Sequence, residues 1–144
     1  PDCYPLPHIH DFAHGLSNAK IFSKIDLVRA YHHIPVAEHD IPETAVTTPF
    51  GLFEFTRMPF GLRNAAQSFQ CFIDEVLRGF SFVFAYIVDI LIASSSQDEH
   101  ELHIRQVFEC LQKLQQTINL NKCIFGVDTL EFLGHKIDKS GITP

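Results

Sequence analysis

The hydrophobic positions of this chain follow helical spacing in some stretches and form short continuous runs in others. In the opening stretch, Ile9, Phe12 and Leu16 lie about one helical turn apart, which predicts a short helix that Gly15 weakens near its end. The run IFSKIDLV, residues 21–28, contains several β-branched and aromatic side chains and is typical of a strand. The chain is therefore expected to begin with a helix and then a strand.

Prolines interrupt the next stretch and disfavour a long helix there. They occur at four positions, which are Pro35, Pro42, Pro49 and Pro59. Because proline lacks an N–H and breaks helices and central strands, this stretch predicts short strands and loops. Residues 45–55, AVTTPFGLFEF, favour two strands joined by a turn at residues 49–51.

Two longer helices are expected in the second half of the chain. Asn64 can cap the first helix, and Gly79 would end it. Its apolar stripe consists of Phe69, Phe72, Ile73, Val76 and Leu77. Ser96 and Glu99 have the spacing of a capping box and would begin the second helix. The inner face of that helix is expected to contain Leu102, Val107, Leu111 and Leu114.

The remaining apolar runs predict strands. Residues 80–94, FSFVFAYIVDILIAS, have the pattern of a β-hairpin with an acidic residue at its tip. Residues 118–126 and 130–138 are expected to be closing strands. Helices that alternate with antiparallel hairpins indicate an α+β fold, with the helices on one face of an antiparallel sheet.

The composition fits one packed domain, since 46% of the 144 residues are hydrophobic. The formal net charge of −6 disfavours a free-standing nucleic-acid-binding protein, but it is compatible with a fragment whose basic part lies elsewhere. Four scattered cysteines without a CxxC pair indicate an intracellular, reduced protein. We expect no signal peptide or membrane span, and the start at Pro1 suggests a piece of a longer polypeptide.

Two carboxylates are candidates for metal-dependent chemistry. Asp26 lies near the end of the first predicted strand, and Asp89 lies at the tip of the predicted hairpin. If the two strands are neighbours, the carboxylates converge and can bind Mg²⁺, which prefers hard oxygen ligands completed by substrate phosphates. From spacing alone, two solvent-facing turn residues are the more common alternative.

A series of consecutive motifs resembles one known family. The stretches are FSKIDLVRAYHHIPVAEHDIPETAVTTPFGLFEFTRMPFGLRNAAQSFQ, AYIVDILIASSSQDEH, NLNKCIFG and LEFLGHKIDKSGITP. In order and spacing, from about Tyr4 to the last residue, they resemble the reverse transcriptase of Ty3/gypsy-type LTR retrotransposons. The resemblance implies a right-handed polymerase fold, in which residues 1–144 form the palm with an interleaved fingers segment at about 36–62. The thumb, connection and ribonuclease H portions would lie beyond Pro144.

The resemblance also implies an activity, which is RNA- and DNA-templated DNA synthesis from deoxynucleoside triphosphates with two Mg²⁺ ions. The expected partners are a primed RNA or DNA template and the rest of a Pol polyprotein, including ribonuclease H and integrase. No membrane partner is expected. The implied location is intracellular, in the cytoplasm or a virus-like particle.

Three residues match catalytic positions of the family. Asp26 of KIDL matches the first catalytic carboxylate, and Asp89 matches the second Asp of a Tyr-x-Asp-Asp motif, so both would be metal ligands. Lys122 of NLNKC matches a lysine proposed to protonate the leaving pyrophosphate. Without the resemblance, a solvated loop lysine would explain Lys122 equally well.

Five further residues match the nucleotide pocket. Leu27 and Val28 could meet the triphosphate through their backbone amides. Tyr31 matches an aromatic gate whose ring leaves no space for a ribose 2′-OH, although a half-buried core tyrosine is the alternative. Phe60 and Gly61 of MPFGLRNA match the strip that lines the pocket.

Contacts to template and primer are implied for six residues, which are Arg63, Gln67, Tyr86, Leu133, Gly134 and His135. Arg63 and Gln67 would lie toward the template strand, unless they are ordinary solvent-facing helix residues. The last three, in FLGH, match the segment that steadies the primer end, where glycine permits close backbone approach.

The chain departs from the family at the hairpin tip, where residues 86–89 read Tyr-Ile-Val-Asp. Val88 replaces the first Asp, which in the family bridges both ions together with the residue matching Asp26. Valine offers no lone pair, and a β-branched residue is poorly suited to a tight turn with positive φ. We therefore expect this copy to be inactive or nearly so. Glu43, where the family often has Lys, and His33, where Gln is common, either weaken nucleic-acid contacts or are neutral changes.

Two other interpretations are open from the sequence. One is a zinc site formed by His8, His10, Asp11 and His14, with His32 and His33 as further candidates. The other is a non-catalytic module that binds nucleic acid or protein and is retained after the chemistry was lost. No second metal-ligand cluster supports the zinc site. Val88 is what the non-catalytic interpretation predicts.

Overall fold

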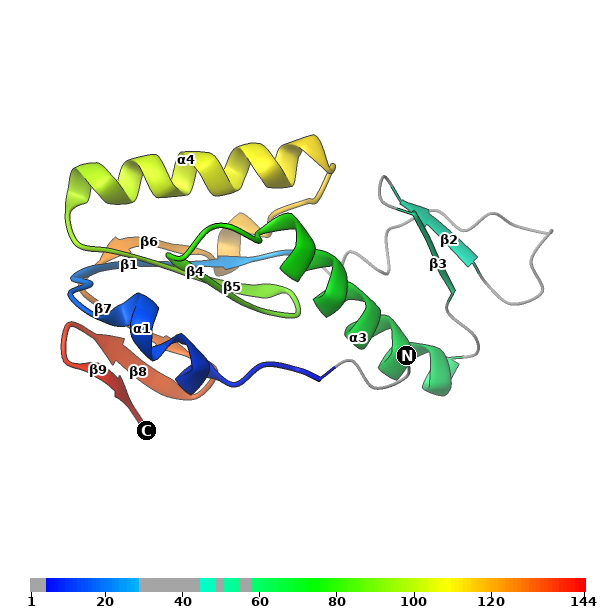
Figure 1. Ribbon diagram of the computed structural model, residues 1–144, viewed down its shortest axis with the longest axis horizontal. Coiled ribbons are helices and arrows are strands. Elements are labelled where there is room, and N and C mark those ends of the chain that lie inside the picture. The colour runs from blue at the N-terminus through cyan, green and yellow to red at the C-terminus, as the bar shows by residue number, and fades with distance from the viewer. Residues whose placement is uncertain (1–4, 29–44, 49–50, 55–57) are drawn as a thin grey trace.

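The computed structural model describes residues 5–28, 45–48, 51–54 and 58–144, with only the backbone described for residues 45–48, 51–54 and 58–65. Its centre is a four-stranded antiparallel sheet with the order β4-β5-β1-β6 (Figure 1). The strands are β1 (Ile21–Asp26), β4 (Val83–Tyr86), β5 (Asp89–Ser94) and β6 (Ile124–Val127). The predicted hairpin and the predicted α+β class are confirmed.

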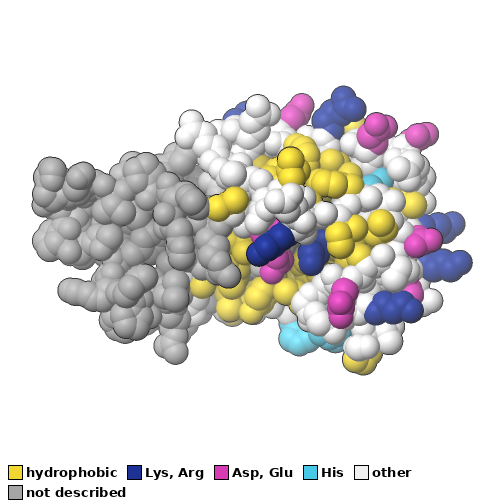
Figure 2. Space-filling model, turned by 180° about the vertical axis from the view of Figure 1, so that it is seen from behind, with side chains coloured by type: hydrophobic (Ala, Val, Ile, Leu, Met, Phe, Trp, Pro, Cys, Tyr) yellow, Lys and Arg dark blue, Asp and Glu magenta, His cyan; other side chains and the backbone are white. Residues whose placement is uncertain are grey.

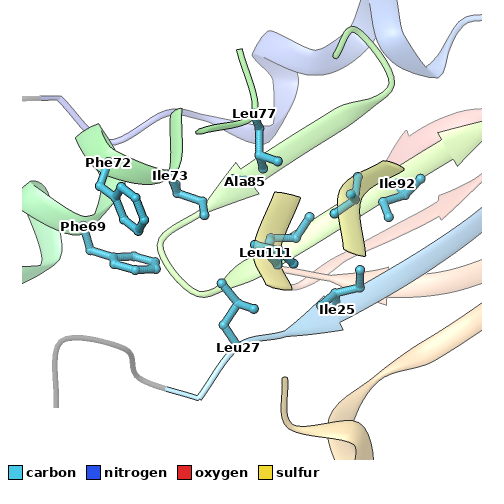
Figure 3. Close-up of a cluster of buried hydrophobic side chains, with 11 residues drawn as sticks. Ile25, Leu27, Phe69, Phe72, Ile73, Leu77, Ala85, Ile92 and Leu111 are labelled. Carbon is cyan, nitrogen blue, oxygen red and sulfur yellow. The ribbon is translucent and has the colours of Figure 1, made fainter. Parts of the chain in front are cut away.

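Two long helices lie on one face of this sheet (Figure 1). They are α3 (Met58–Val76) and α4 (Gln97–Lys113). Their apolar stripes pack against side chains of the sheet, and we call this group the helix-side cluster (Figure 3). Its buried members are Ile25, Leu27, Phe69, Phe72, Ile73, Leu77, Ala85, Ile90, Ile92, Val107 and Leu111. Full burial of a side chain of this size stabilises the fold by about 1.5–3 kcal/mol, so this helix-side cluster fixes both helices to the sheet.

The opposite face carries a second layer that the sequence pattern did not predict in this form. It consists of η1 (Ile9–Phe12), α1 (Ala13–Leu16) and a three-stranded sheet of β7 (Thr129–Phe132), β8 (His135–Asp138) and β9 (Gly141–Thr143). The Phe84 ring of β4 contacts the rings of Phe12 and Phe132, with centroids 5.7 and 6.1 Å apart. Residues 130–138 therefore form a hairpin rather than the single closing strand expected.

Alternation along β1 explains why the sheet has two apolar faces. Ile25 and Leu27 point into the helix-side cluster, whereas Phe22 joins the cluster on the opposite face. All three are at most 1% exposed. The predicted strand at residues 21–28 is correct in position, but β1 ends at Asp26, and Leu27 continues only as an isolated bridge to Ile118.

Several element boundaries differ from the expectations. The opening helix divides into η1 and α1, and the short pair β2 (Ala45–Thr48) and β3 (Gly51–Glu54) confirms two antiparallel strands there. Helix α3 begins at Met58, so Asn64 lies inside the helix and the predicted cap was wrong. Pro59 is compatible with this start because the first helical turn needs no backbone donor there. The turn at residues 49–50 lies outside the described residues.

Helix α4 also corrects two details. Ser96 caps it through a 3.2 Å hydrogen bond from the Glu99 backbone N–H, but the Glu99 carboxylate accepts from the backbone N–H and hydroxyl of Ser95. The expected reciprocal capping box is therefore shifted by one residue. Leu102 is 54% exposed, whereas Val107 and Leu111 are fully buried, so the inner face is narrower than predicted.

A buried polar chain connects α4 to three strands. His100 is 1% exposed, and its Nε2 lies 2.6 Å from Ser23 Oγ of β1 while its Nδ1 lies 2.7 Å from Ser94 Oγ of β5. The Gly126 N–H of β6 donates to Ser23 Oγ at 2.8 Å, which leaves the Ser23 hydroxyl proton for His100. Ser94 Oγ also lies 2.7 Å from His103 Nδ1. We assign His100 as neutral, with its proton on Nδ1.

This arrangement predicts acid sensitivity. Burial lowers the pKa of His100 below its usual value, and the nearby charge of His103 lowers it further. As the pH falls, His100 is therefore protonated in the unfolded chain before it is protonated in the folded chain. The free energy of unfolding should consequently decrease as the pH drops below about 6.5. His100→Gln should lower the free energy of unfolding by about 1–3 kcal/mol at pH 7.5, and the free energy of unfolding of this variant should depend less on pH in the acid range. Chemical denaturation at several pH values tests this, with the exposed His14→Gln as control.

Candidate active site

The two candidate carboxylates lie directly opposite each other. Strands β1 and β5 pair antiparallel, and their last register pair is Asp26 with Asp89. Directly opposed residues share a face of the sheet, with Cβ atoms about 4.5–5.5 Å apart. That face is opposite α3 and α4, because the alternating neighbour Ile25 points into the helix-side cluster. The two strands are neighbours, which is the condition on which the predicted convergence of the two acids depends.

Two facing carboxylates repel each other, and an opposed like-charge pair destabilises a sheet. Carboxylate oxygens are hard ligands of the kind that divalent cations prefer. Both residues are half-buried, at the end of their strands. The arrangement is therefore suited to one divalent cation that shares further ligands with a bound phosphate.

The hairpin tip is a tight two-residue loop, since Tyr86 pairs with Asp89 across it. The positive φ falls on Ile87, at 53°, and not on Val88. A β-branched residue in this region costs about 1–3 kcal/mol and persists only when its surroundings hold it. The expected conflict between a β-branched residue and the turn thus exists, but one position earlier than predicted.

Gln70 of α3 holds this strained tip. Its side chain is completely buried, and its Oε1 accepts the Ile87 backbone N–H at 2.6 Å. Its Nε2 donates to Ala85 O at 3.0 Å and to Asp74 Oδ1 at 2.9 Å. The sequence reasoning missed Gln70, although a glutamine three residues before Ile73 within an inward stripe is a usable signal.

Val88 lies against the helix-side cluster as a half-buried side chain. Its backbone oxygen accepts the Leu27 N–H at 2.9 Å, which ties the tip of the hairpin to the end of β1. The residue that departs from the family motif therefore serves the packing of the tip. It supplies no oxygen ligand from its side chain.

The end of β1 is also held by the loop that contains η2 (Leu120–Lys122). Asn119 N–H donates to Asp26 O at 2.7 Å, and the Asp26 N–H contacts Cys123 Sγ at 3.3 Å. Burial raises the pKa of the Cys123 thiol, so it stays protonated at neutral pH. Lys122 is exposed at the end of η2, in the segment bound to the Asp26 backbone.

The amides of Leu27 and Val28 are not available to a triphosphate in this conformation. The Leu27 N–H donates to Val88 O, and the Val28 N–H donates to Thr117 O at 2.8 Å. The Leu27 side chain is 1% exposed within the helix-side cluster. Both residues therefore stabilise the end of β1, and the geometry does not support the nucleotide-binding role expected from their amides.

The turn between β7 and β8 contains three other candidates. Leu133 and Gly134 have φ values of 53° and 79°, which form a two-residue hairpin loop with both φ values positive. His135 Nδ1 lies 3.0 Å from Leu133 O. Since the φ of Leu133 is strained, the turn is a candidate functional segment on the layer beside the Asp26 face.

The other candidates are only partly described. Tyr86 is half-buried and shares a row with Asp89, and Gln67 is half-buried on α3. Phe60, Gly61 and Arg63 lie in the first turns of α3, where side chains are outside the description. Tyr31 lies outside the described residues, as do the two departures His33 and Glu43.

The proposed zinc cluster is not assembled among the described residues. His8 Nδ1 lies 3.2 Å from His10 Nδ1, and Asp11 accepts the His8 backbone N–H at 3.0 Å. His14 instead lines a groove of about 390 Å³ together with His103. Within residues 5–28 and the other described ranges, no group of three His, Cys, Asp or Glu side chains could hold a metal ion. His32 lies outside those ranges.

No helix in the described part of the chain has the length and apolarity needed to cross a bilayer.

An antiparallel sheet with two helices on one face and a second β layer on the other is consistent with the palm of nucleic-acid polymerases, and solved structures share this fold. The chain superposes on a foamy viral protease–reverse transcriptase in complex with an RNA/DNA hybrid with a TM-score of 0.76 and 23% identity, covering 98% of this chain and 19% of that one. For a second such structure, in complex with double-stranded DNA, the TM-score is 0.73 at 25% identity, over 96% of this chain and 25% of that one.

The sequence comparisons identify the family. The model of the reverse transcriptase (RNA-dependent DNA polymerase) family matches residues 1–137, and the chain belongs to this family. It is 41% identical over 144 residues to the Pol polyprotein of transposon opus and 38% identical over 143 residues to that of transposon gypsy, both from Drosophila melanogaster. The Tf2-3 polyprotein of Schizosaccharomyces pombe is 38% identical over 146 residues.

The matched region is a small part of these relatives. The alignments cover 98–100% of this chain but only 11–14% of the three polyproteins. The predicted resemblance to reverse transcriptases of Ty3/gypsy-type retrotransposons is therefore confirmed for the chain as a partial domain.

The role of Gln70 leads to a testable prediction. Gln70→Leu preserves the approximate size but leaves the Ile87 N–H and Ala85 O without their partner, so stability should fall by about 1–3 kcal/mol. Hydrogen exchange at the tip amides should accelerate more than in the rest of the sheet. Gln112→Leu, on the exposed side of α4, is the matched control and should change neither quantity. Equal exchange at the tip in both variants would contradict this role.

Proposed function

We propose that this chain is the palm and fingers portion of a retrotransposon reverse transcriptase, with the fingers segment at about residues 36–62. The full protein would also carry thumb, connection, ribonuclease H and integrase portions. Its reaction is templated DNA synthesis from deoxynucleoside triphosphates on RNA and DNA. The observation that carries this proposal is the direct pairing of Asp26 with Asp89 in a chain of this family.

Reverse transcriptases use divalent metal ions, and two facing carboxylates fit at least one such ion. Asp26 and Asp89 would hold it, and it would neutralise charge on the triphosphate. We propose Mg²⁺ as that ion. Lys122, exposed in the segment whose residues Asn119 and Cys123 bond to the Asp26 backbone, would give a proton to the leaving pyrophosphate.

The remaining candidate residues would contact the primer, the template and the incoming nucleotide. The turn at Leu133 and Gly134, with His135, would steady the primer end, and Tyr86 would lie beside it in the row of Asp89. Arg63 and Gln67 would face the template, while Tyr31, Phe60 and Gly61 would form the nucleotide pocket. The protein would act inside the cell, in the cytoplasm or a virus-like particle.

This copy would be inactive or nearly so, because Val88 removes one carboxylate from the site. With two acids instead of three, a second ion lacks ligands and the developing phosphate charge is less well balanced. Loss of one group that stabilises transition-state charge typically costs on the order of a hundredfold or more in rate. The half-buried contact of Val88 with the helix-side cluster supports its retention for packing.

Restoring the acid is the central experiment. Val88→Asp in the full-length polymerase should raise primer extension on the order of a hundredfold or more over the unsubstituted protein. In the control Val88→Asn, the side chain has nearly the shape of aspartate but no charge, so primer extension should not rise comparably. Incorporation of labelled deoxynucleotides on a primed template, with Mg²⁺, measures the effect. Thermal unfolding of each variant separates it from loss of the fold.

Two results would count against this assignment. Robust extension by the protein with Val88 would overturn the claim of inactivity. A folded Val88→Asp protein without extension would overturn the catalytic proposal itself.

A second candidate is a non-catalytic remnant that still binds nucleic acid or protein. Val88 favours it, because binding does not require the third carboxylate. Salt-dependent binding of a primer–template by the Val88 protein, together with no extension by Val88→Asp, would select this candidate.

A further inference from the structure

Lys24 occupies an unusual position on the same sheet face as the two acids. It precedes Asp26 by two residues on β1, so both side chains point to the same side. Its cross-strand partners are Leu91 on β5 and Ile124 on β6. Lys24 therefore lies one row behind the acid pair, about 7 Å further along the strand.

The exposure of its neighbours shows where this face opens. Phe22, two residues earlier on β1, is completely buried beneath the β7–β9 layer. Lys24 is half-buried, and Ile124 beside it is 39% exposed. On the β5 side of Lys24 the face is still covered, since Leu91 is 0% exposed, so the face opens at Lys24 toward β6 and toward the acid row. Its aliphatic stem can lie along apolar neighbours while the ammonium reaches the open part.

No carboxylate of the described residues forms an ion pair with Lys24, in contrast to the surface lysine Lys136, which lies 3.7 Å from Asp138. Within the described ranges, the Lys24 ammonium therefore has no ion-pair partner, although Asp26 lies two residues away on the same face.

A chain with a net charge of −6 has few cations to offer a polyanion. On the side shown in Figure 2, basic and acidic side chains of the described part are interspersed, both near the centre and around the edge, and form no broad basic surface. Contact with nucleic-acid phosphates therefore has to depend on individually placed cations. A half-buried lysine beside the acid pair is such a placement.

We propose that Lys24 binds a backbone phosphate of the primer–template and so positions the strand against the Asp26–Asp89 pair. This inference rests on the proposed function and adds a residue to it. The location between the acid row and the β7–β9 layer favours a backbone phosphate over the triphosphate. A lysine contact of this kind contributes affinity that is independent of base sequence.

The test is the salt dependence of primer–template binding by the full-length polymerase. Lys24→Met keeps most of the stem and removes the charge, so binding should weaken roughly tenfold and the salt slope should fall by about one. Lys24→Arg should retain most of the affinity and slope. Lys113→Met, at the end of α4 on the opposite face, should match the unsubstituted protein.

The outcomes separate this inference from the proposed function. An unchanged slope and affinity for Lys24→Met, in a protein that binds primer–template normally, overturns the role of Lys24 alone. The same result with weakened equilibrium binding of deoxynucleoside triphosphates would assign Lys24 to the triphosphate and also overturn it. A protein that shows no salt-dependent binding at all would count against the nucleic-acid role as a whole.

Discussion

The pairing register of β1 with β5 is the constraint on which the candidate site depends. It places Asp26 opposite Asp89 and at the same time buries Ile25 and Leu27 against the helices. A shift by one residue would move every side chain of β1 to the other face, exchanging buried apolar groups for charges. The core thus fixes the site, because the same alternation that fills the helix-side cluster directs the acids away from it.

The second constraint is the support of a strained hairpin tip. Ile87 adopts a positive φ that a β-branched residue rarely takes, and Gln70 compensates through its hydrogen bond to the Ile87 N–H. The loop at Asn119 supports the other side of the site, because the Asn119 N–H donates to Asp26 O and fixes the backbone at the end of β1. The two acids are therefore held from α3 and from the η2 loop, two segments far apart in the sequence.

The buried hydrogen bonds of His100 also fix the alignment of β1 and β5, at the end of the sheet away from the acids. His100 joins Ser23 and Ser94, which belong to the two strands that carry the acids. Because these groups are buried, each needs a specific partner, and a shifted register would leave them unsatisfied. Packing, hydrogen bonding and the placement of charge thus agree on one alignment of β1 and β5.

The sequence by itself determined the α+β class, the hairpin around Asp89, the stripe of α3 and, through its motifs, the family. These depend on local periodicity and on residues read in order. Only the tertiary structure decided that Asp26 and Asp89 are opposed, that the amides of Leu27 and Val28 are already bonded, and that Leu102 is exposed. Gln70 and Lys24 also emerged only there, because their roles come from strands and helices that are distant in sequence and meet only when the chain packs.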